Sequence, residues 1–439
     1  MQKVVKFGGS SLASAKQFKK VKKIILEDPA RKYVVPSAPG KRHNRDIKVT
    51  DMLYSCYKKA EDGEYFLDTL EAIQERYEKI IEGLELSLSL EEEFKEIQKQ
   101  FEAKAGSAYA ASRGEYLNGI IMSAYLEMPF IDAAEVIFFD ENGNFDDART
   151  DMQLKKRLSQ EPTAVIPGFY GAKPDGTIQT FSRGGSDITG SLVAKAIDAD
   201  LYENWTDVSG FMVTDPRIIK NPEMIETITY RELRELSYMG ATVLHEEAIF
   251  PVRKVGIPIN IRNTNNPEEP GTYIVESTCK KPKYTITGIA GKEGFVSVHI
   301  EKAMMNAEIG YGRKVLQVFE DHGIAFEHMP SGIDTMTVYV RQEDFEPYEQ
   351  QVVAGIQRAV GPDLIELESD LALIAVVGRG MRSARGTAGR IFSALAHANV
   401  EVKMIDQGSS GLNVIIGVKS CDFAPAIKAI YDIFVTTQL

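Results

Sequence analysis

Cysteine is scarce in this chain of 439 residues, which contains only Cys56, Cys279 and Cys421. The number is odd and no two of them form a CxxC pair, which argues against a thioredoxin-like motif or a cysteine-based zinc site. No run of about 18 apolar residues occurs, as a membrane-spanning helix would need. The N-terminus has no signal-peptide core, because Gly8 and Gly9 interrupt it. We therefore expect a soluble, cytoplasmic protein without membrane contacts.

Positive charge is also in short supply. The chain has 51 Lys and Arg residues against 63 Asp and Glu residues, a formal net charge of −12. Because nucleic-acid binding needs a cationic surface, this balance argues against a nucleic-acid partner. An anionic ligand must then be held by local cations and backbone N–H groups. The apolar fraction of 44% is that of an ordinary globular protein, and the length predicts about three domains.

The first part of the chain alternates strand and helix patterns, which predicts an α/β domain with a mostly parallel sheet. One face of a helix is formed by Phe18, Val21, Ile24 and Ile25, and residues 51–104 form a long, charged helical segment. The expected strands are Val4–Phe7, Tyr33–Val35 (ended by Pro36), Phe130–Ala133 and Thr163–Ile166.

The last part of the chain contains an internal repeat with an offset of 76 residues, in which Gly310 matches Gly386. Each copy predicts a strand, a glycine-containing loop, a helix, a strand, a turn and a strand, which begins a ferredoxin-like βαββαβ module. The repeat alone fits a duplicated ligand-binding module or a duplicated dimerisation unit. We expect domains at 1–283, 284–360 and 361–439, and leave strand exchange between the two modules open.

Two loops in the first domain have the residue types that hold phosphate groups. Lys6–Ser11 places a cation at a strand end, before a glycine turn into a helix, where backbone N–H groups and the helix N-terminus favour an anion. Phe181–Asp187 has the same order of strand, glycine turn and helix. Neither is a Walker A motif. A tight turn with a solvated lysine, and a helix cap at Asp187, are the structural alternatives.

Two further segments carry polar residues that could bind a ligand. Trp205–Arg217 holds the only tryptophan; Thr206 and Asp207 could bind a nucleotide, and Arg217 could pair with phosphate. The alternative is a β-hairpin with an Asp-Pro turn. Ser112–Glu115 is expected to open a helix, where a glutamate usually stabilises the helix dipole.

Taken in order, these loops resemble the amino-acid-kinase family and, within it, the aspartate kinases. The repeat is similar to the paired ACT domains that such kinases use as amino-acid sensors. The resemblance covers essentially the whole chain, and the matching segments are Lys6–Ser11, Ser37–Gly40 with Thr50 and Asp51, Ser112–Glu115, Ser182–Asp187, Trp205–Val208 with Thr214–Arg217, Gly240–His245, Gly380 with Met381, and Met404–Ser410.

The resemblance implies that ATP phosphorylates the side-chain carboxylate of L-aspartate to 4-phospho-L-aspartate, the first step towards lysine, threonine and methionine. Lys6, with Gly9 beside it, would stabilise the transferring phosphoryl group, and Asp187 would hold Lys6. Mg²⁺ would accompany ATP, and no protein metal ligand is identified. The implied aspartate-binding residues are Ser37, Thr50, Glu115 (for the α-ammonium) and Arg183 (for a carboxylate). The implied ATP positions are Lys6, Phe7, Gly8, Gly9, Ser10, Ser186, Thr206, Asp207, Met212, Arg217, Thr242 and Val243.

Two positions depart from the family pattern. Thr242 stands where relatives commonly have a lysine that reaches ATP, and Met212 where some have an aromatic residue. The loss of that lysine motivates one alternative, a catalytically inactive amino-acid sensor. Another alternative is a kinase acting on glutamate or acetylglutamate, against which the repeat and the Trp205–Asp207 segment argue.

The ACT pair implies feedback inhibition, by lysine or threonine bound at the interface between ACT domains of two chains, in a homodimer or a dimer of dimers. Glu327 favours lysine, because its carboxylate could pair with the ε-ammonium. The alternative is an outward-facing strand residue without a ligand. The implied effector-binding residues are Met305, Gly310, Tyr311, Phe326, Glu327 and Ser331.

Overall fold

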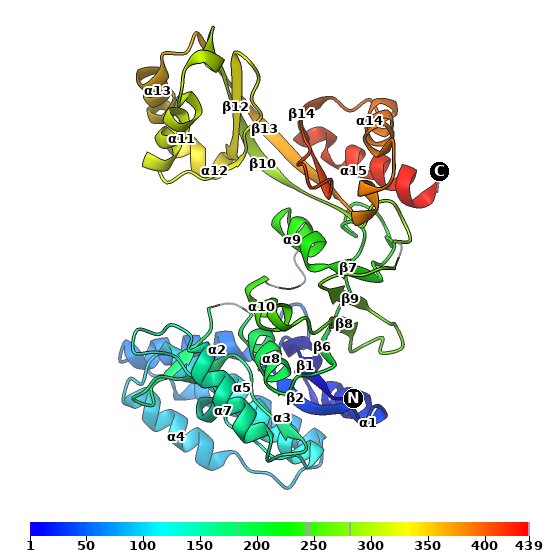
Figure 1. Ribbon diagram of the computed structural model, residues 1–439. Coiled ribbons are helices and arrows are strands. Elements are labelled where there is room, and N and C mark those ends of the chain that lie inside the picture. Colours follow the sequence, from blue (N-terminus) through cyan, green and yellow to red (C-terminus); the bar gives the residue numbers. More distant parts are fainter. Residues whose placement is uncertain (183, 242–243, 245, 281, 438–439) are drawn as a thin grey trace. The chain divides into compact units, whose positions relative to one another are not determined.

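The computed structural model of the chain describes residues 1–182, 184–241, 244, 246–280 and 282–437. The chain divides into two compact units. The first comprises Met1–Phe211, Glu226–Tyr230 and Val243–Thr278, and the second comprises Met212–Ile225, Arg231–Thr242 and Cys279–Leu439. Figure 1 colours both by position in the sequence.

A seven-stranded sheet forms the centre of the first unit, in the order β3-β2-β1-β6-β8-β9-β7. The five strands from β3 to β8 are parallel, and β9 turns antiparallel to β8. The predicted α/β class with a mostly parallel sheet is therefore confirmed. The strands are β1 (Lys3–Phe7), β2 (Arg31–Pro36), β3 (Ala164–Val165), β6 (Leu201–Thr206), β7 (Thr227–Thr229), β8 (Ile259–Asn263) and β9 (Thr272–Val275), with a separate hairpin of β4 (Tyr170–Ala172) and β5 (Ile178–Thr180).

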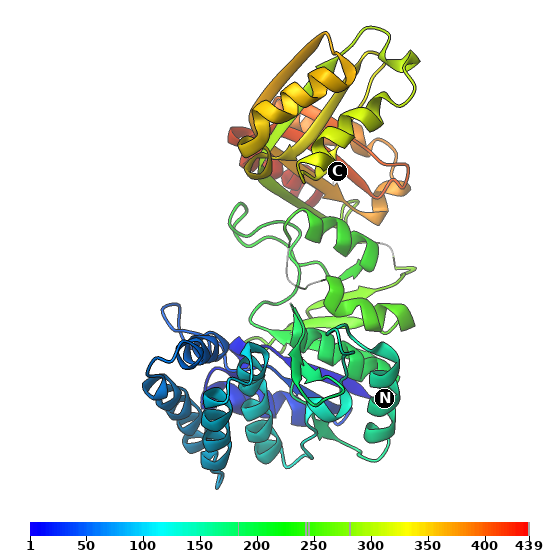
Figure 2. The ribbon, with the colours of Figure 1, turned by 90° about the vertical axis from the view of Figure 1, so that its left-hand side faces the viewer.

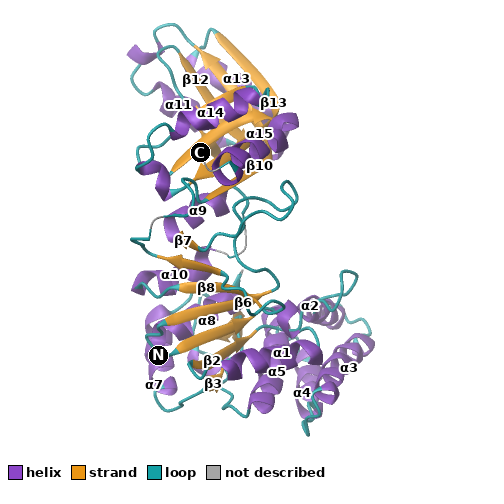
Figure 3. Ribbon diagram, turned by 90° about the vertical axis from the view of Figure 1, so that its right-hand side faces the viewer, coloured by secondary structure: helices purple, strands orange, loops and turns teal. Residues whose placement is uncertain are grey.

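Helices cover both faces of this sheet. In Figure 3, α7 (Asp147–Leu158) and α10 (Glu246–Val255) lie on one side, and α1 (Ala15–Glu27) and α5 (Ser107–Leu126) lie on the other. Helix α8 (Gly185–Ala196) packs on β1, β2 and β6 beside α7 and α10. The predicted apolar face of α1 is buried in the core. The result is a layer of strands between two layers of helices.

The segment predicted as one long helical stretch forms three helices, α2 (Val49–Glu61), α3 (Leu67–Gly83) and α4 (Glu91–Glu102). Figure 2 shows them gathered at one side of the first unit, in blue to cyan. Their buried residues join those of β1, α1 and α5 in one apolar core. This arrangement places α2 and α3 next to the loops that follow β1 and β2.

Two local predictions in the first unit are wrong. Residues 130–133 are not a strand: Phe130 makes a single parallel bridge to Val165, and the Asp132 carboxylate then accepts the N–H of Ala134 at 2.9 Å and caps the short helix α6 (Ala133–Val136). The aspartate's capping ability outweighs the apolar pattern. Pro36 does not lie outside its strand but is the last residue of β2, paired in register with Phe7.

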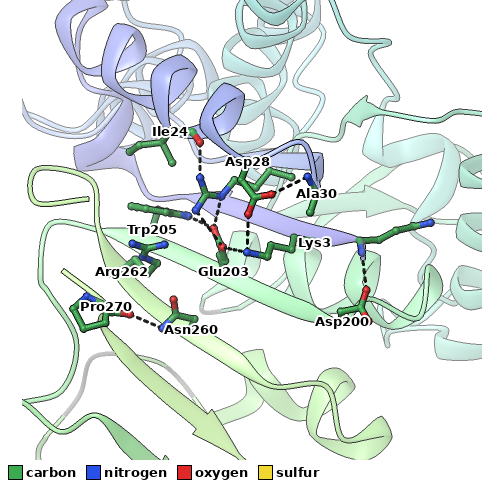
Figure 4. Close-up of polar contacts among 12 residues, drawn as sticks. Lys3, Ile24, Asp28, Ala30, Asp200, Glu203, Trp205, Asn260, Arg262 and Pro270 are labelled. Atoms are coloured by element: carbon green, nitrogen blue, oxygen red, sulfur yellow. Dashed lines mark hydrogen bonds and ion pairs between the residues drawn. The ribbon is translucent and has the colours of Figure 1, made fainter. Parts of the chain in front are cut away.

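A buried carboxylate on β6 binds the first residues of the neighbouring strands β1 and β2 (Figure 4). Glu203 on β6 is 1% exposed and accepts hydrogen bonds from Arg31 Nε at 2.8 Å, Lys3 Nζ at 3.1 Å and Trp205 Nε1 at 2.8 Å. The guanidinium groups of Arg31 and Arg262 face the Trp205 ring. The network therefore fixes Trp205 at the end of β6.

Glu203→Ala should lower the free energy of unfolding of the first unit by about 3–5 kcal/mol, because removing one partner of a buried ion pair leaves uncompensated charge. Urea unfolding followed by the fluorescence of Trp205, the only tryptophan, measures this. Glu27→Ala is the matched control, since Glu27 pairs with Lys23 on the surface. A loss for Glu203→Ala no larger than that of the control would show that the network contributes little.

The second unit is built on a six-stranded antiparallel sheet, in the order β11-β12-β10-β13-β15-β14. The strands are β10 (Gly288–Glu301), β11 (Phe326–His328), β12 (Thr335–Arg341), β13 (Leu364–Val377), β14 (Val402–Asp406) and β15 (Asn413–Lys419). The helices are most of α9 (Tyr230–Tyr238), then α11 (Tyr311–Asp321), α12 (Gln342–Phe345), α13 (Glu349–Val360), α14 (Thr387–His397) and α15 (Phe423–Tyr431).

The predicted repeat is visible in this unit. Helices α11 and α14 begin one repeat apart, and the glycines before them, Gly310 and Gly386, both have φ of +82°. Strands β10 and β13 are each 14 residues long and run through both copies: β12 pairs with the second half of β10, and β15 pairs with the second half of β13. The two copies thus share their central strands.

In the described part of the chain, no helix is both long and apolar enough to cross a membrane.

Candidate active site

A pocket of about 610 Å³ lies at the carboxyl ends of the central strands of the first unit. The loops after β1 and β2, the end of β6, and helices α2 and α5 all contribute to it, as expected where parallel strands end together. Eight residues implied by the family resemblance line it: Gly8, Gly9, Ser10, Ser37, Thr50, Glu115, Thr206 and Asp207.

The loop after β1, which contains Gly9, contacts the loop after β2, which contains Gly40. The N–H of Gly40 donates to the carbonyl of Gly9 at 2.8 Å. A Cβ atom on Gly9 would lie 2.8 Å from the Ala38 carbonyl oxygen, and one on Gly40 would lie 2.5 Å from the Gly9 carbonyl carbon. Because only glycine permits this approach, the loop after β1 is held against the loop after β2.

Lys6 lies near the end of β1, where its side chain is 9% exposed and its Nζ is 2.6 Å from Oδ1 of Asp187. Asp187 stands in the first turn of α8. Its Oδ1 also accepts a hydrogen bond from Nδ2 of Asn204 at 2.8 Å. A Cβ atom on Gly8 would lie 3.7 Å from Lys6 Nζ, which places the ammonium beside the glycine loop. The predicted pairing of Lys6 with Asp187 is thus present in the structure.

The sequence analysis missed Asn204. It is the direct neighbour of Lys6 across the parallel β1–β6 pair, and it is 3% exposed. The only signal was an amide inside an otherwise buried strand, where a polar side chain needs a hydrogen-bond partner. Sequence alone could not say that this partner is Asp187.

Glu115 is a buried carboxylate in the middle of α5, so the prediction that Ser112–Glu115 opens a helix is wrong. The helix begins at Ser107, and Gly114 lets it approach the loop after β2, since a Cβ atom there would lie 2.8 Å from Ala38 Cβ. The Glu115 carboxylate accepts the N–H of Ala38, while its Oε2 has no hydrogen-bond partner among the described residues. Burial raises the pKa of Glu115 to about 8, opposed by backbone hydrogen bonds and the charge of Lys6.

The other predicted nucleotide positions are placed less directly. The Phe7 ring is fully buried and stacks on Trp205, with ring centroids 6.0 Å apart, so only its backbone is available to a ligand. Ser186 is buried near the start of α8. Arg183, Thr242 and Val243, like His245, lie outside the described residues.

Met212 and Arg217 belong to the second unit. Met212 bridges to Met224, and the Arg217 side chain is 89% exposed and paired with Asp215 at 2.5 Å. The backbone N–H of Arg217 also donates to Asp215 Oδ1 at 2.8 Å, which makes the Asp-Pro segment a turn.

The residues predicted to bind an effector lie in the first copy of the repeat. Tyr311 is buried, and its hydroxyl has no hydrogen-bond partner in the described part of the chain. Phe326 begins the edge strand β11 and is 47% exposed. Glu327 already has a cationic partner, because its carboxylate lies 3.2 Å from Arg341 Nε. Burial is the main cause that raises the pKa of Tyr238 to about 12, and Glu327 adds to it. Met305 is buried in the short turn before α11, close in sequence to Gly310, and Ser331 bridges to Met336.

Within the described residues, no group of three or more His, Cys, Asp or Glu side chains could hold a metal ion alone. The described side chains therefore do not form a metal site of their own. A Mg²⁺ ion brought by ATP would be bound mainly by phosphate oxygens, whose charge it would partly neutralise.

Comparison with known proteins places the chain in a family. Residues 1–263 match the amino acid kinase family, and residues 374–434 match the ACT domain. The chain is thus an amino acid kinase followed by an ACT region. It is 42% identical to Aspartokinase 3 of Bacillus subtilis (strain 168), with 98% of each chain covered. It is also 51% identical to the aspartate kinase of Clostridium acetobutylicum, whose crystal structure superposes with a TM-score of 0.91 over 98% of this chain and 99% of that one.

Within the amino acid kinases, the chain belongs to the aspartate kinases, phosphotransferases with a carboxyl group as acceptor. Two structures of Escherichia coli aspartokinase III, 24% identical, share the fold. One is a complex with aspartate and ADP (R-state; TM-score 0.73; 99% of both chains), and the other a complex with lysine and aspartate (T-state; TM-score 0.74; 98% of this chain and 99% of that one).

Proposed function

We propose that the 610 Å³ pocket is where ATP phosphorylates the side-chain carboxylate of L-aspartate, giving ADP and 4-phospho-L-aspartate. The observation that carries the proposal is that the Lys6–Asp187 pair lies beside Gly8 of the pocket wall, while the pocket-lining Glu115 has an Oε2 without a hydrogen-bond partner among the described residues. A buried carboxylate oxygen needs a hydrogen-bond donor, and the α-ammonium of aspartate would be one. The aspartate and ADP bound to the E. coli enzyme support the same assignment.

In this mechanism an aspartate carboxylate oxygen attacks the γ-phosphorus in line. The new O–P bond forms as the bond to the β,γ-bridging oxygen breaks, and ADP leaves with that electron pair. The nucleophile is already ionised, so no general base is needed, and catalysis consists of positioning and charge stabilisation. Lys6 stabilises the charge on the transferring phosphoryl group, and the N–H groups of Gly9 and Ser10 bind the neighbouring phosphate oxygens. The N–H of Gly8 donates to the carbonyl of Trp205 at 2.9 Å, so Gly8 serves the nucleotide by letting it approach the loop closely. Glu115 holds the α-ammonium, and Ser37, Thr50 and Arg183 bind the rest of aspartate.

The nucleotide then lies along the glycine loop, with Ser186, Thr206 and Asp207 of the first unit as its further contacts. Met212, Arg217, Thr242 and Val243 stay predictions from the family resemblance. The product is an acyl phosphate at the head of the pathway to lysine, threonine and methionine.

An assay with hydroxylamine, which traps acyl phosphates as hydroxamates, tests the proposal. Hydroxamate should form only with ATP and aspartate. Formation with glutamate or acetylglutamate instead would identify another carboxylate kinase, and no hydroxamate at all would identify an inactive sensor.

We further infer that lysine inhibits the enzyme by binding at ACT interfaces in a homodimer or a dimer of dimers. The lysine complex of the E. coli relative, the paired modules and the acidic Glu327 support lysine over threonine. Because Arg341 already pairs with Glu327, an incoming ε-ammonium would compete with that guanidinium.

Lysine should therefore inhibit hydroxamate formation, and Glu327→Ala should raise the lysine concentration for half-inhibition by about tenfold, the loss of one charge-assisted contact. Glu320→Ala, on the exposed side of α11, is the matched control and should leave inhibition unchanged. Titration with lysine and with threonine measures both variants. Equal inhibition of Glu327→Ala and the unaltered enzyme would exclude Glu327 as the lysine partner.

A further inference from the structure

A cationic loop, Lys41–Lys48, forms part of the pocket wall that the family resemblance did not include. Its sequence, KRHNRDIK, carries four Lys and Arg residues and one histidine in a chain whose net charge is −12. Three of the four cationic residues line the pocket, Lys41, Arg42 and Lys48, together with His43. ATP and aspartate are both anions, so this concentration of charge lies where the reactants would bind.

The loop is held in place by a buried arginine from α3. Arg76 is 4% exposed, and its guanidinium donates to the carbonyl of Ile47 at 2.5 Å and to the carbonyl of Gly40. It also lies 3.1 Å from the carboxylate of Asp46. Arg76 therefore ties together both ends of the loop and its one carboxylate.

Asp46 in turn binds Arg42. It accepts hydrogen bonds from Nε of Arg42 at 2.8 Å, from Nη2 at 2.9 Å and from the backbone N–H at 2.8 Å. These contacts hold the pKa of Asp46 far below its usual range, mainly through the Arg42 side chain. The guanidinium of Arg42 is thus already paired with Asp46 and stabilises the loop itself.

Lys41 and Lys48 differ from Arg42. Both are exposed, and neither has a carboxylate partner within the described ranges. Lys41 follows Gly40, which contacts Gly9 of the phosphate-type loop, whereas Lys48 is the N-cap of α2, two residues before Thr50. Among the pocket-lining Lys and Arg residues of the loop, these are the two without a carboxylate partner in the described part of the chain. They lie at opposite ends of the loop, Lys41 beside the predicted phosphate contacts and Lys48 beside a predicted aspartate contact.

We propose that Lys41 binds the phosphates of ATP, that Lys48 binds a carboxylate of aspartate, and that Arg76 is the positioning residue that holds both. This inference rests on the proposed function of the pocket. It adds the loop to the substrate-binding groups and gives a catalytic purpose to the helical segment that carries Arg76.

Steady-state kinetics at low ionic strength test the two lysines separately. Lys41→Gln should raise the KM for ATP, and Lys48→Gln the KM for aspartate, each by about two- to fivefold, as for a solvent-exposed charge pair. The turnover number should stay within a factor of about two, and the effects should shrink at high salt. Lys58→Gln on the exposed face of α2 is the control and should change neither constant.

A double-variant comparison tests Arg76. Arg76→Lys keeps the charge but cannot reach three acceptors, so it should raise both KM values, and adding Lys48→Gln to it should have little further effect. A merely structural role would lower the melting temperature and leave the effect of Lys48→Gln intact. Unchanged KM values in both lysine variants, or exchanged effects on ATP and aspartate, would overturn the proposal. Aspartate-dependent activity that still depends on Lys6 would then leave the proposed function standing.

Discussion

Replacing Lys6 by alanine should lower kcat by roughly 10³-fold, while the chain remains folded. Its ammonium lies beside Gly8 at the pocket, and in the proposed reaction it faces charge that develops on the phosphoryl oxygens. A preorganised cation in a site shielded from water acts mainly on the transition state, so KM should change much less than kcat. Initial rates of hydroxamate formation over a range of ATP and aspartate concentrations measure the two constants.

Lys3→Ala is the control for Lys6, because Lys3 lies at the other end of the same strand and is also ion-paired. Its Nζ contacts Asp28 at 2.8 Å and Glu203 at 3.1 Å, away from the pocket. We expect Lys3→Ala to lower the melting temperature and leave kcat nearly unchanged. If Lys6→Ala turned over at the rate of the unaltered enzyme, the role of Lys6 would have to be abandoned. Asp187→Asn should lower kcat by less than Lys6→Ala does, because it removes the ion-pair partner of Lys6 but leaves the charge of the lysine in place.

Replacing Glu115 by glutamine should raise the KM for aspartate by about 10- to 100-fold, with a smaller effect on kcat. The buried Oε2 has no partner in the described protein, and the substrate α-ammonium would supply a charge-assisted hydrogen bond. The variant keeps the shape of the side chain and removes its charge. Asn118→Ala, one turn further along α5 and bonded to the Ser37 carbonyl at 2.6 Å, separates loss of charge from loss of the loop contact.

The pH dependence of aspartate binding gives the same carboxylate a second test. In the free enzyme, burial raises the pKa of Glu115 from 4.5 to about 8, so the carboxyl is protonated below that pH and must lose its proton to bind an ammonium. The KM for aspartate should therefore fall as pH rises from 6 to 8, by up to about tenfold per unit. Glu115→Gln should remove this slope. A slope that survives in Glu115→Gln would assign it to another group.

The same raised pKa of Glu115 should make the unliganded enzyme less stable as the pH rises, whereas aspartate binding should improve. The folded chain holds the Glu115 proton more tightly than the unfolded chain does. This contribution to the free energy of unfolding is complete below pH 4.5 and is lost as the pH rises to about 8. Saturating aspartate should reduce that loss, because the ammonium favours the ionised carboxylate.

Much of the site could be predicted because its parts are local in sequence. A lysine before a glycine turn marks the end of a parallel strand, and parallel strand ends meet at one edge of a sheet. Asp187 stands at the start of a helix, which its glycine turn indicates, although the strand before it belongs to the separate β4–β5 hairpin. Asn204, Arg76 and Asp46 could not be found this way. Their roles depend on which strand neighbours β1 and on where α3 crosses the loop after β2, and no short motif carries that information.

The two errors have different physical causes. Apolar residues at 130–133 suggested a strand, but the Asp132 carboxylate caps a helix there. The Ser112–Glu115 segment suggested a helix start, because a glutamate is common in a first turn. Its glycine instead serves close packing in the middle of α5, where Cβ would collide with Ala38. A local side-chain cap decided the first case, and a tertiary contact decided the second over local preference.

The shared strands β10 and β13 have a consequence for how the two ACT-like copies can evolve and be divided. Each strand is 14 residues long and hydrogen-bonds within both copies. A stop codon between α13 and β13 would leave the first copy's β10 without its neighbour, so the first copy would not be an intact module. The β10–β13 pairing continues from one copy to the other, with register shifts between Glu293 and Phe295 and between Phe295 and Ser297 at its centre. The duplication therefore produced one ACT region whose two copies share their central strands, and not two separate modules in tandem.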